Sequence, residues 1–211
     1  MIHQFKSLFF NLPLDEKANV ITHGFGLVLA ILAAPWLLWS EWQPIHLLGL
    51  SVFVFGMVFM FTSSTCYHLA NKEVRKNKWR LIDHLSIFIL IGSTYTPFIL
   101  YYYNTQSGMR FLLLHWMIIV FGIVFKLIFK TRFEIVSLTL YLVLGWMVLF
   151  IYRDITLNMS DTVNFWLIAG GISYTIGVYF YIKTHLAWHH AIWHIFVICG
   201  CAAHYIALYL S

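Results

Sequence analysis

Seven long runs of apolar residues divide this chain, and they limit the folds that it can adopt. Stretches such as LGLSVFVFGMVFMF and FLLLHWMIIVFGIVF are continuously apolar and do not alternate in polarity. An apolar helix of about 20 residues crosses the hydrocarbon core of a bilayer, whereas a strand of a membrane barrel alternates over about 10 residues. With 61% hydrophobic and 10% charged residues, the composition also excludes an ordinary soluble domain. The sequence predicts an all-α integral membrane protein.

The breaks between the apolar runs predict one seven-helix transmembrane domain over residues 19–211. Residues 1–18 are predicted to form a short interfacial segment, because Phe5, Phe9 and Leu12 give it an apolar face and Pro13 then interrupts it. The expected spans are residues 19–40, 46–69, 80–102, 110–129, 134–152, 161–183 and 188–210.

The basic residues predict the orientation of the helices. Cytoplasmic connectors of membrane proteins are enriched in Lys and Arg, so the side that carries most of them is expected to face the cytoplasm. This places the N-terminus inside and the C-terminus outside, and the pI near 9.1 gives no reason to expect a nucleic-acid partner. Only Arg110 and Arg153 lie on the outer side, and the other 11 of the 13 basic residues lie on the inner side: Lys6, Lys17, Lys72, Arg75, Lys76, Lys78, Arg80, Lys126, Lys130, Arg132 and Lys183.

Four ionisable residues interrupt the predicted spans at one depth. His68 ends the second span, Asp83 begins the third, and His190 and His194 lie in the first two turns of the seventh. The predicted orientation places all four in the cytoplasmic third of the bilayer. Ionisable groups inside apolar helices are costly, so each is a candidate functional residue.

The spacing of these residues favours a zinc site. His190 and His194 are four residues apart, which puts both rings on one helix face. With His68 as a third imidazole, the fourth tetrahedral position stays open for water, as in catalytic zinc sites. Asp83 is then expected to direct that water and accept its proton, and Ser64, one turn before His68, to hydrogen-bond the water or polarise a substrate carbonyl.

The same residue types also have plainer interpretations. Asp83 could serve only as the N-cap of the third helix. His84 and His189 point about 100° away from the site on their helices, which favours a supporting or interfacial role. Packing or interfacial roles are expected for the histidines without a partner of metal-binding type, which are His3, His46, His115, His185 and His204.

Four motifs also occur in a characteristic order along the chain. They are ExxNxxTH (Glu16, Asn19, Thr22, His23), SxxxH (Ser64, His68), an aspartate before GSxxxP (Asp83, Gly92, Ser93, Pro97) and HxxxH (His190, His194). Together they resemble the hemolysin III group of the progestin and adipoQ receptor family, which is distantly similar to alkaline ceramidases.

The resemblance implies a seven-helix fold with the N-terminus inside and a zinc held by His68, His190 and His194. It further implies that Asp83 binds the water on that zinc and that Ser64 and Glu16 support the site; Asn19 and His23 of the first motif are expected to support it as well. The short N-terminus is similar to that of the bacterial members, so a bacterial cytoplasmic membrane is the expected location.

These expectations favour a membrane-embedded, zinc-dependent hydrolase, similar to ceramidases, that cleaves an amide or ester bond of a lipid. Membrane lipids are the expected partners, either as substrate or as a bound fatty acid. One alternative is a non-enzymatic protein, a receptor-like regulator or a pore-forming cytolysin, in which zinc clamps three helices together. Ion transport is a further alternative. It is weakened because the ionisable groups cluster at one side of the membrane without a polar relay to the other.

Overall fold

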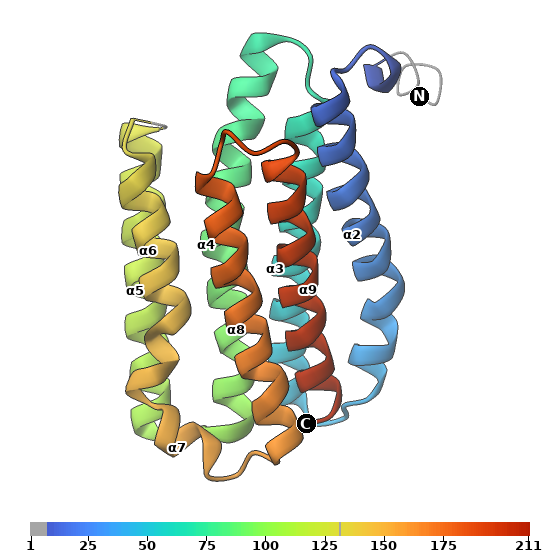
Figure 1. The fold of residues 1–211 in the computed structure, drawn as a ribbon. Coiled ribbons are helices and arrows are strands. Elements are labelled where there is room, and N and C mark those ends of the chain that lie inside the picture. The colour runs from blue at the N-terminus through green and yellow to red at the C-terminus, as the bar shows by residue number, and fades with distance from the viewer. Residues whose placement is uncertain (1–7, 131) are drawn as a thin grey trace.

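The apolar runs of the sequence form long helices that lie side by side (Figure 1). The structure, a computed structural model, describes residues 8–130 and 132–211, and these residues form helices and connectors without strands. Six of the helices are long and apolar enough to cross a membrane, which confirms an all-α, multi-pass membrane protein. They are α2 (Leu14–Trp39), α3 (Pro44–Leu69), α4 (Glu73–Tyr102), α5 (Gln106–Phe129), α8 (Asp161–Ile182) and α9 (His189–Tyr209).

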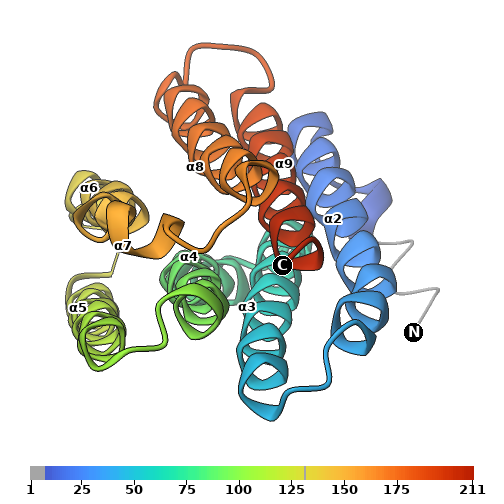
Figure 2. The same ribbon diagram turned by 90° about the horizontal axis from the view of Figure 1, so that it is seen from below.

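The apolar run predicted as a single helix over residues 134–152 has a different form. It consists of α6 (Glu134–Trp146), the 3₁₀ turn η1 (Met147–Phe150) and the short helix α7 (Tyr152–Thr156). At the junction the Tyr95 hydroxyl donates to the Gly145 carbonyl at 2.9 Å and accepts from the Val148 amide at 2.7 Å. This side chain therefore supplies partners to backbone groups where the regular helix ends. Figure 1 shows the segment running along the bundle, and Figure 2 shows that it lies next to α5.

The first long helix begins earlier than predicted. Residues 8–10 are helical, and α2 starts at Leu14 directly after Pro13, so the chain is interrupted where the sequence predicted. Asp15 and Glu16 lie in the first turn of α2, where negative charge stabilises a helix N-terminus. Of the predicted interfacial segment, residues 1–7 lie outside the described part of the chain.

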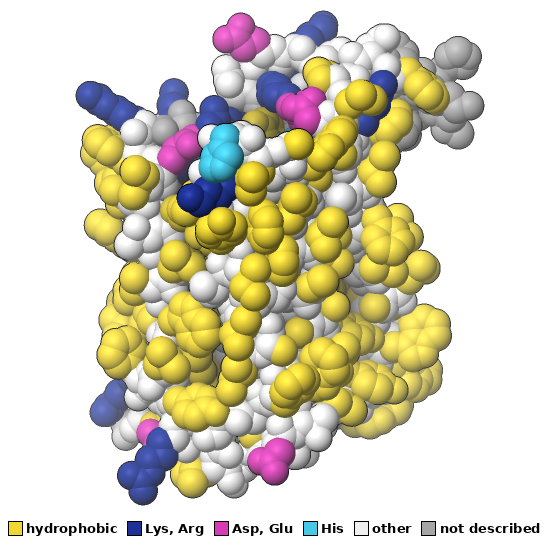
Figure 3. All heavy atoms as spheres, viewed as in Figure 1, with side chains coloured by type: hydrophobic (Ala, Val, Ile, Leu, Met, Phe, Trp, Pro, Cys, Tyr) yellow, Lys and Arg dark blue, Asp and Glu magenta, His cyan; other side chains and the backbone are white. Residues whose placement is uncertain are grey.

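Side chains of different kinds separate along the bundle. Large apolar residues are exposed around its middle, such as Phe55 (60% exposed) and Leu113 (62% exposed). Figure 3 shows hydrophobic side chains over the middle of one face, with charged side chains gathered towards both ends. An exposed apolar belt of this kind matches the hydrocarbon core of a bilayer. The end at which α2 begins is called the N-terminal end below.

At the opposite end of the bundle, Glu41 fixes the connector between α2 and α3. Its carboxylate accepts hydrogen bonds from the Tyr101 hydroxyl of α4 at 2.6 Å and from the Gln43 amide at 2.6 Å. Burial raises the pKa of Glu41, but these hydrogen bonds outweigh burial and lower the pKa to about 2. The carboxylate therefore remains charged at neutral pH, where its hydrogen bonds hold the connector against α4.

Glycines allow α3 and α4 to approach closely. A Cβ atom on Gly56 would lie 2.6 Å from the Cβ of Ser93, and one on Gly49 would lie 2.9 Å from the Cα of Pro97. Both distances are shorter than van der Waals contact, so only glycine fits at these two positions. The close approach brings the end of α3, with Ser64 and His68, next to Asp83 on α4.

Gly56→Ala is expected to lower the free energy of unfolding by about 1–3 kcal/mol, because the added methyl group must push α3 away from α4. The readout is the apparent melting temperature of the detergent-solubilised protein. Gly145→Ala is the matched control, since nothing lies within 4 Å of a Cβ at that position. Equal melting temperatures for the two variants would contradict the close packing of α3 on α4.

Candidate metal centre

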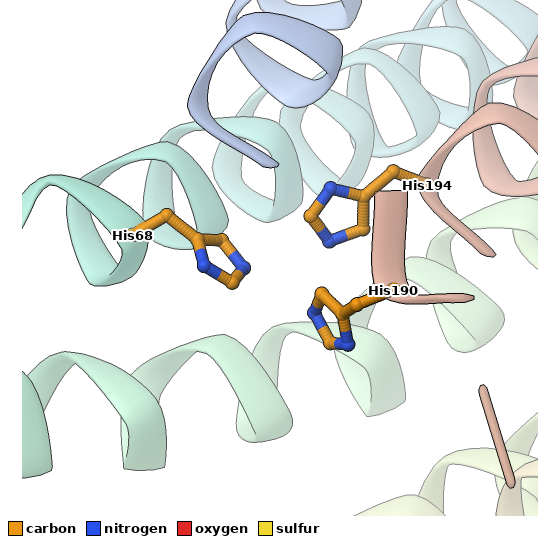
Figure 4. Close-up of side chains that lie close together, drawn as sticks. All are labelled: His68, His190 and His194. Atoms are coloured by element: carbon orange, nitrogen blue, oxygen red, sulfur yellow. The ribbon is translucent and has the colours of Figure 1, made fainter. Parts of the chain in front are cut away.

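Three histidines from two helices face one another at the N-terminal end of the bundle (Figure 4). His68 lies in the last turn of α3, and His190 and His194 lie in the first two turns of α9. One ring nitrogen of each residue lies within 4.8 Å of those of the other two. The rings of His190 and His194 are 4.6 Å apart between centroids, as the spacing of four residues predicts. This group could hold a metal ion.

A carboxylate on α2 fixes the orientation of His68. Nδ1 of His68 donates to Glu16 Oε2 at 2.6 Å, and Glu16 also forms an ion pair with Lys76 of α4. Because Nδ1 carries the proton, Nε2 keeps its lone pair, and Nε2 is buried with no hydrogen-bond partner among the described residues. A carboxylate behind a histidine in this way orients the ring and makes it a stronger metal ligand.

The hydroxyl of Thr22, which also lies on α2, fixes the orientation of His194. Thr22 Oγ1 donates its single proton to the backbone, at 3.0 Å from the carbonyls of Ala18 and Asn19. Its contact of 3.0 Å with His194 Nδ1 is therefore one in which Thr22 accepts and the histidine donates. His194 thus also presents the lone pair of Nε2. The sequence motif contained Thr22, but this role was not predicted.

His23 and Asn19 lie behind the three histidines. The ring of His23 stacks on His194 with centroids 3.5 Å apart and an angle of 16° between the planes. Both nitrogens of His23 and Oδ1 of Asn19 are buried without partners among the described residues. His23 packs its other side against Phe61, with ring centroids 5.2 Å apart. The structure therefore places these two residues beside the group and leaves the three ligand positions to the other histidines.

Asp83 and Ser64 line the same cavity as His190 and His194. Asp83 is 9% exposed and forms no ion pair among the described residues, and Ser64 is 1% exposed. Asp83 does not cap a helix, because α4 begins ten residues earlier, at Glu73. The capping interpretation is therefore wrong, and burial of a carboxylate without a basic partner, which is costly, makes Asp83 a candidate functional residue.

The histidines predicted to have packing or interfacial roles differ in burial, and His46 among them is half-buried. His115 is fully buried with its ring centroid 4.0 Å from that of Tyr95, and His204 Nε2 contacts the Leu167 carbonyl at 3.1 Å. His185 is exposed, and His3 lies outside the described residues. The predicted packing roles therefore fit His115 and His204.

An apolar cavity of about 380 Å³ extends from the histidines into the bundle. Its walls come from α4, α6, α8 and α9, and its lining on α4 runs from Asp83 to Phe98. At 1.5 Å per residue, these two positions are about 22 Å apart along the helix, a large part of the thickness of a bilayer core. The polar group therefore lies at one end of a long apolar space.

The comparison with known proteins supports what the motifs indicated. The profile of the family described as "Haemolysin-III related" matches residues 13–205. The chain belongs to the haemolysin-III-related family. Similar proteins of known name include the "Hemolysin-3 homolog" of Bacillus subtilis, which is 36% identical over 195 residues and 90% of each chain.

Two further relatives show how far the similarity extends. "Hemolysin-3" of Bacillus cereus is 32% identical over 191 residues, which cover 89% of this chain and 87% of that one. The human "Monocyte to macrophage differentiation factor" is 25% identical over 209 residues, which cover 92% and 83% of the two chains. The match to the haemolysin III family includes the candidate site residues from Glu16 to His194.

Glu16→Gln is expected to weaken the affinity for added Zn²⁺ by about 10- to 100-fold, because the neutral amide oxygen accepts the hydrogen bond from Nδ1 of His68 more weakly than the carboxylate does. The measurement is competition with a chelator of known affinity. Glu41→Gln at the opposite end is the matched control and is expected to bind Zn²⁺ as the wild type does. If Glu16→Gln also retained wild-type affinity, Glu16 would not orient a metal ligand.

Proposed function

We propose that this protein is a membrane-embedded, zinc-dependent hydrolase that cleaves an amide or ester bond of a lipid. The observation that carries the proposal is the position of the histidine group. His190 and His194, which lie close to His68, line one long apolar cavity together with the buried carboxylate of Asp83. A lipid chain in that cavity would present its polar linkage to the histidines and to Asp83.

The proposed topology follows from the charges and from the helices. The short helix α6 with η1 would supply the fifth of seven spans, because it runs the length of the bundle beside α5. The connector between α3 and α4 and the first turns of α4 carry five of the basic residues at the N-terminal end. This end would face the cytoplasm. The relatives from Bacillus support a location in a bacterial cytoplasmic membrane.

The donor set fits zinc. The three ligand candidates are neutral imidazoles, and two of them are fixed by Glu16 and Thr22 so that Nε2 is available. Zinc in a site with three protein ligands supplies Lewis acidity and lowers the pKa of water towards about 7.

The residues of the chain have separate proposed roles in the reaction. Asp83 would hold the attacking water by a hydrogen bond and accept its proton, since its carboxylate has no basic partner. The hydroxyl of Ser64 would donate a hydrogen bond to the carbonyl oxygen as it gains charge. The apolar walls between α4, α6, α8 and α9 would position the acyl chain and exclude bulk water.

A structural metal in a non-enzymatic protein is the second candidate. It is favoured by the origin of the ligands, because His68 comes from α3 and the other two from α9. A metal would thus join two helices, and not three as predicted from the sequence. The Bacillus relatives carry the name hemolysin, which suits a cytolytic or regulatory protein with such a clamp.

Asp83→Asn is expected to retain zinc and to lose hydrolysis by a factor of about 10²–10⁴, because the amide cannot accept a proton. The measurement combines metal content with mass-spectrometric product analysis after incubation with ceramide and with phosphatidylglycerol in mixed micelles.

Asp161→Asn, at the first residue of α8, is the matched control and is expected to keep wild-type turnover. Wild-type protein that holds stoichiometric zinc yet releases no fatty acid from either lipid would contradict the hydrolase. If removal of zinc from that protein then lowered its melting temperature, the structural metal would be the better account.

A further inference from the structure

A buried lysine lies at the N-terminal end of the bundle, where the cavity also contains Asp83 and the histidines. Lys126 is 1% exposed, although it is only three residues from the end of α5 at Phe129. A lysine so close to a helix end usually extends to the membrane surface. Here Nζ turns inward instead and donates to Ser137 Oγ of α6 at 3.2 Å. Burial of this cation needs an explanation.

The described residues do not neutralise Lys126. Its partner Ser137 is uncharged, and no carboxylate forms an ion pair with it among the described residues. Glu134 lies near enough for its charge to act on Lys126, but it is paired with Arg80, so its single negative charge faces two positive ones. An ammonium group has three donors, and one hydrogen bond is found. The ammonium group of Lys126 therefore keeps a positive charge and two N–H donors that no described residue satisfies.

The same cavity connects Lys126 to the candidate metal centre. Its lining includes Lys126, Ser137 and His84, together with Asp83 and His190. An anionic group in the cavity could therefore reach Lys126 while the rest of the same molecule lies against the histidines. A charge pair formed away from water is also stronger than one at a surface.

We propose that Lys126 binds the phosphate of an anionic membrane phospholipid, so that the cavity selects phosphate-bearing lipids over neutral ones. This rests on the proposed function only in naming the substrate class, because recognition of the phosphate requires no turnover. The acyl chain occupies the apolar part of the cavity, and the phosphate replaces the carboxylate that Lys126 lacks. The arrangement explains why the lysine is turned inward.

The test measures binding without hydrolysis, on the full chain with the Asp83→Asn substitution. The probes are dioleoyl phosphatidic acid and dioleoylglycerol in neutral detergent micelles, which differ only in the phosphate. The first is expected to bind at least about 30-fold more tightly. Equal binding of the two probes would overturn the proposal without any further variant.

Variants of two lysines, one in the last turn of α5 and one directly after it, then assign the effect. Lys126→Gln is expected to remove the preference for phosphatidic acid, and Lys126→Arg to keep most of it. Lys130→Gln is the matched control, because Lys130 is exposed and lies outside the cavity lining, so this variant should keep the full preference. The apparent melting temperature in detergent shows whether each variant is folded. A preference that survives in folded Lys126→Gln, or that Lys130→Gln also loses, would contradict the assignment.

A competition arm separates a lipid from a free anion. Inorganic phosphate has no acyl chain. It is therefore expected not to displace phosphatidic acid when phosphatidic acid is present at a concentration that saturates its site. Displacement by inorganic phosphate would show an anion site that does not recognise lipid. Wild-type protein that hydrolyses neither lipid, beside an Asp83→Asn protein that keeps the phosphate preference, would contradict the proposed function but support Lys126 as the binding residue.

Discussion

Two hydrogen bonds from α2 decide which nitrogens of the histidine group face the site. Glu16 accepts a hydrogen bond from Nδ1 of His68, and Thr22 accepts one from Nδ1 of His194. Each ring can then offer only its other nitrogen to a metal. Since Glu16 is also paired with Lys76, the orientation of His68 depends on α2, α3 and α4 together. The chemistry available at the site follows from this arrangement, because metal ligands must be both neutral and correctly directed.

The bundle places these histidines and Asp83 in apolar surroundings, where electrostatic interactions are stronger than in water. Glycines at the contact of α3 and α4 bring His68 and Asp83 to the same end, and α9 begins there with His190. Trp188, directly before α9, has a left-handed backbone with φ of 61°, a conformation that is costly for a bulky residue. Backbone strain therefore occurs next to the ligands, where the chain must turn sharply from α8 into the first turn of α9.

Much of this architecture could be predicted from the sequence, because a membrane-spanning helix needs a long apolar run and such runs are visible in the sequence. Apolar length predicted the six long helices, and the spacing of His190 and His194 predicted rings on one face. The change of α6 into a 3₁₀ turn could not be predicted, since it depends on Tyr95 from another helix. Lys126 counted in the sequence only as a basic residue of a connector. Its inward position depends on Ser137 and on the packing of α5 against α6, which periodicity does not show.

Zinc-edge X-ray absorption of the purified wild-type protein tests the central claim most directly, because it reports the ligands of the metal and whether one position is open. The account predicts three imidazole nitrogens at about 2.0–2.1 Å and one oxygen ligand, the coordination of a catalytic site. A fourth imidazole, such as that of the adjacent His23, would close the site and contradict a hydrolase. Protein that binds no zinc at all would contradict the metal centre itself.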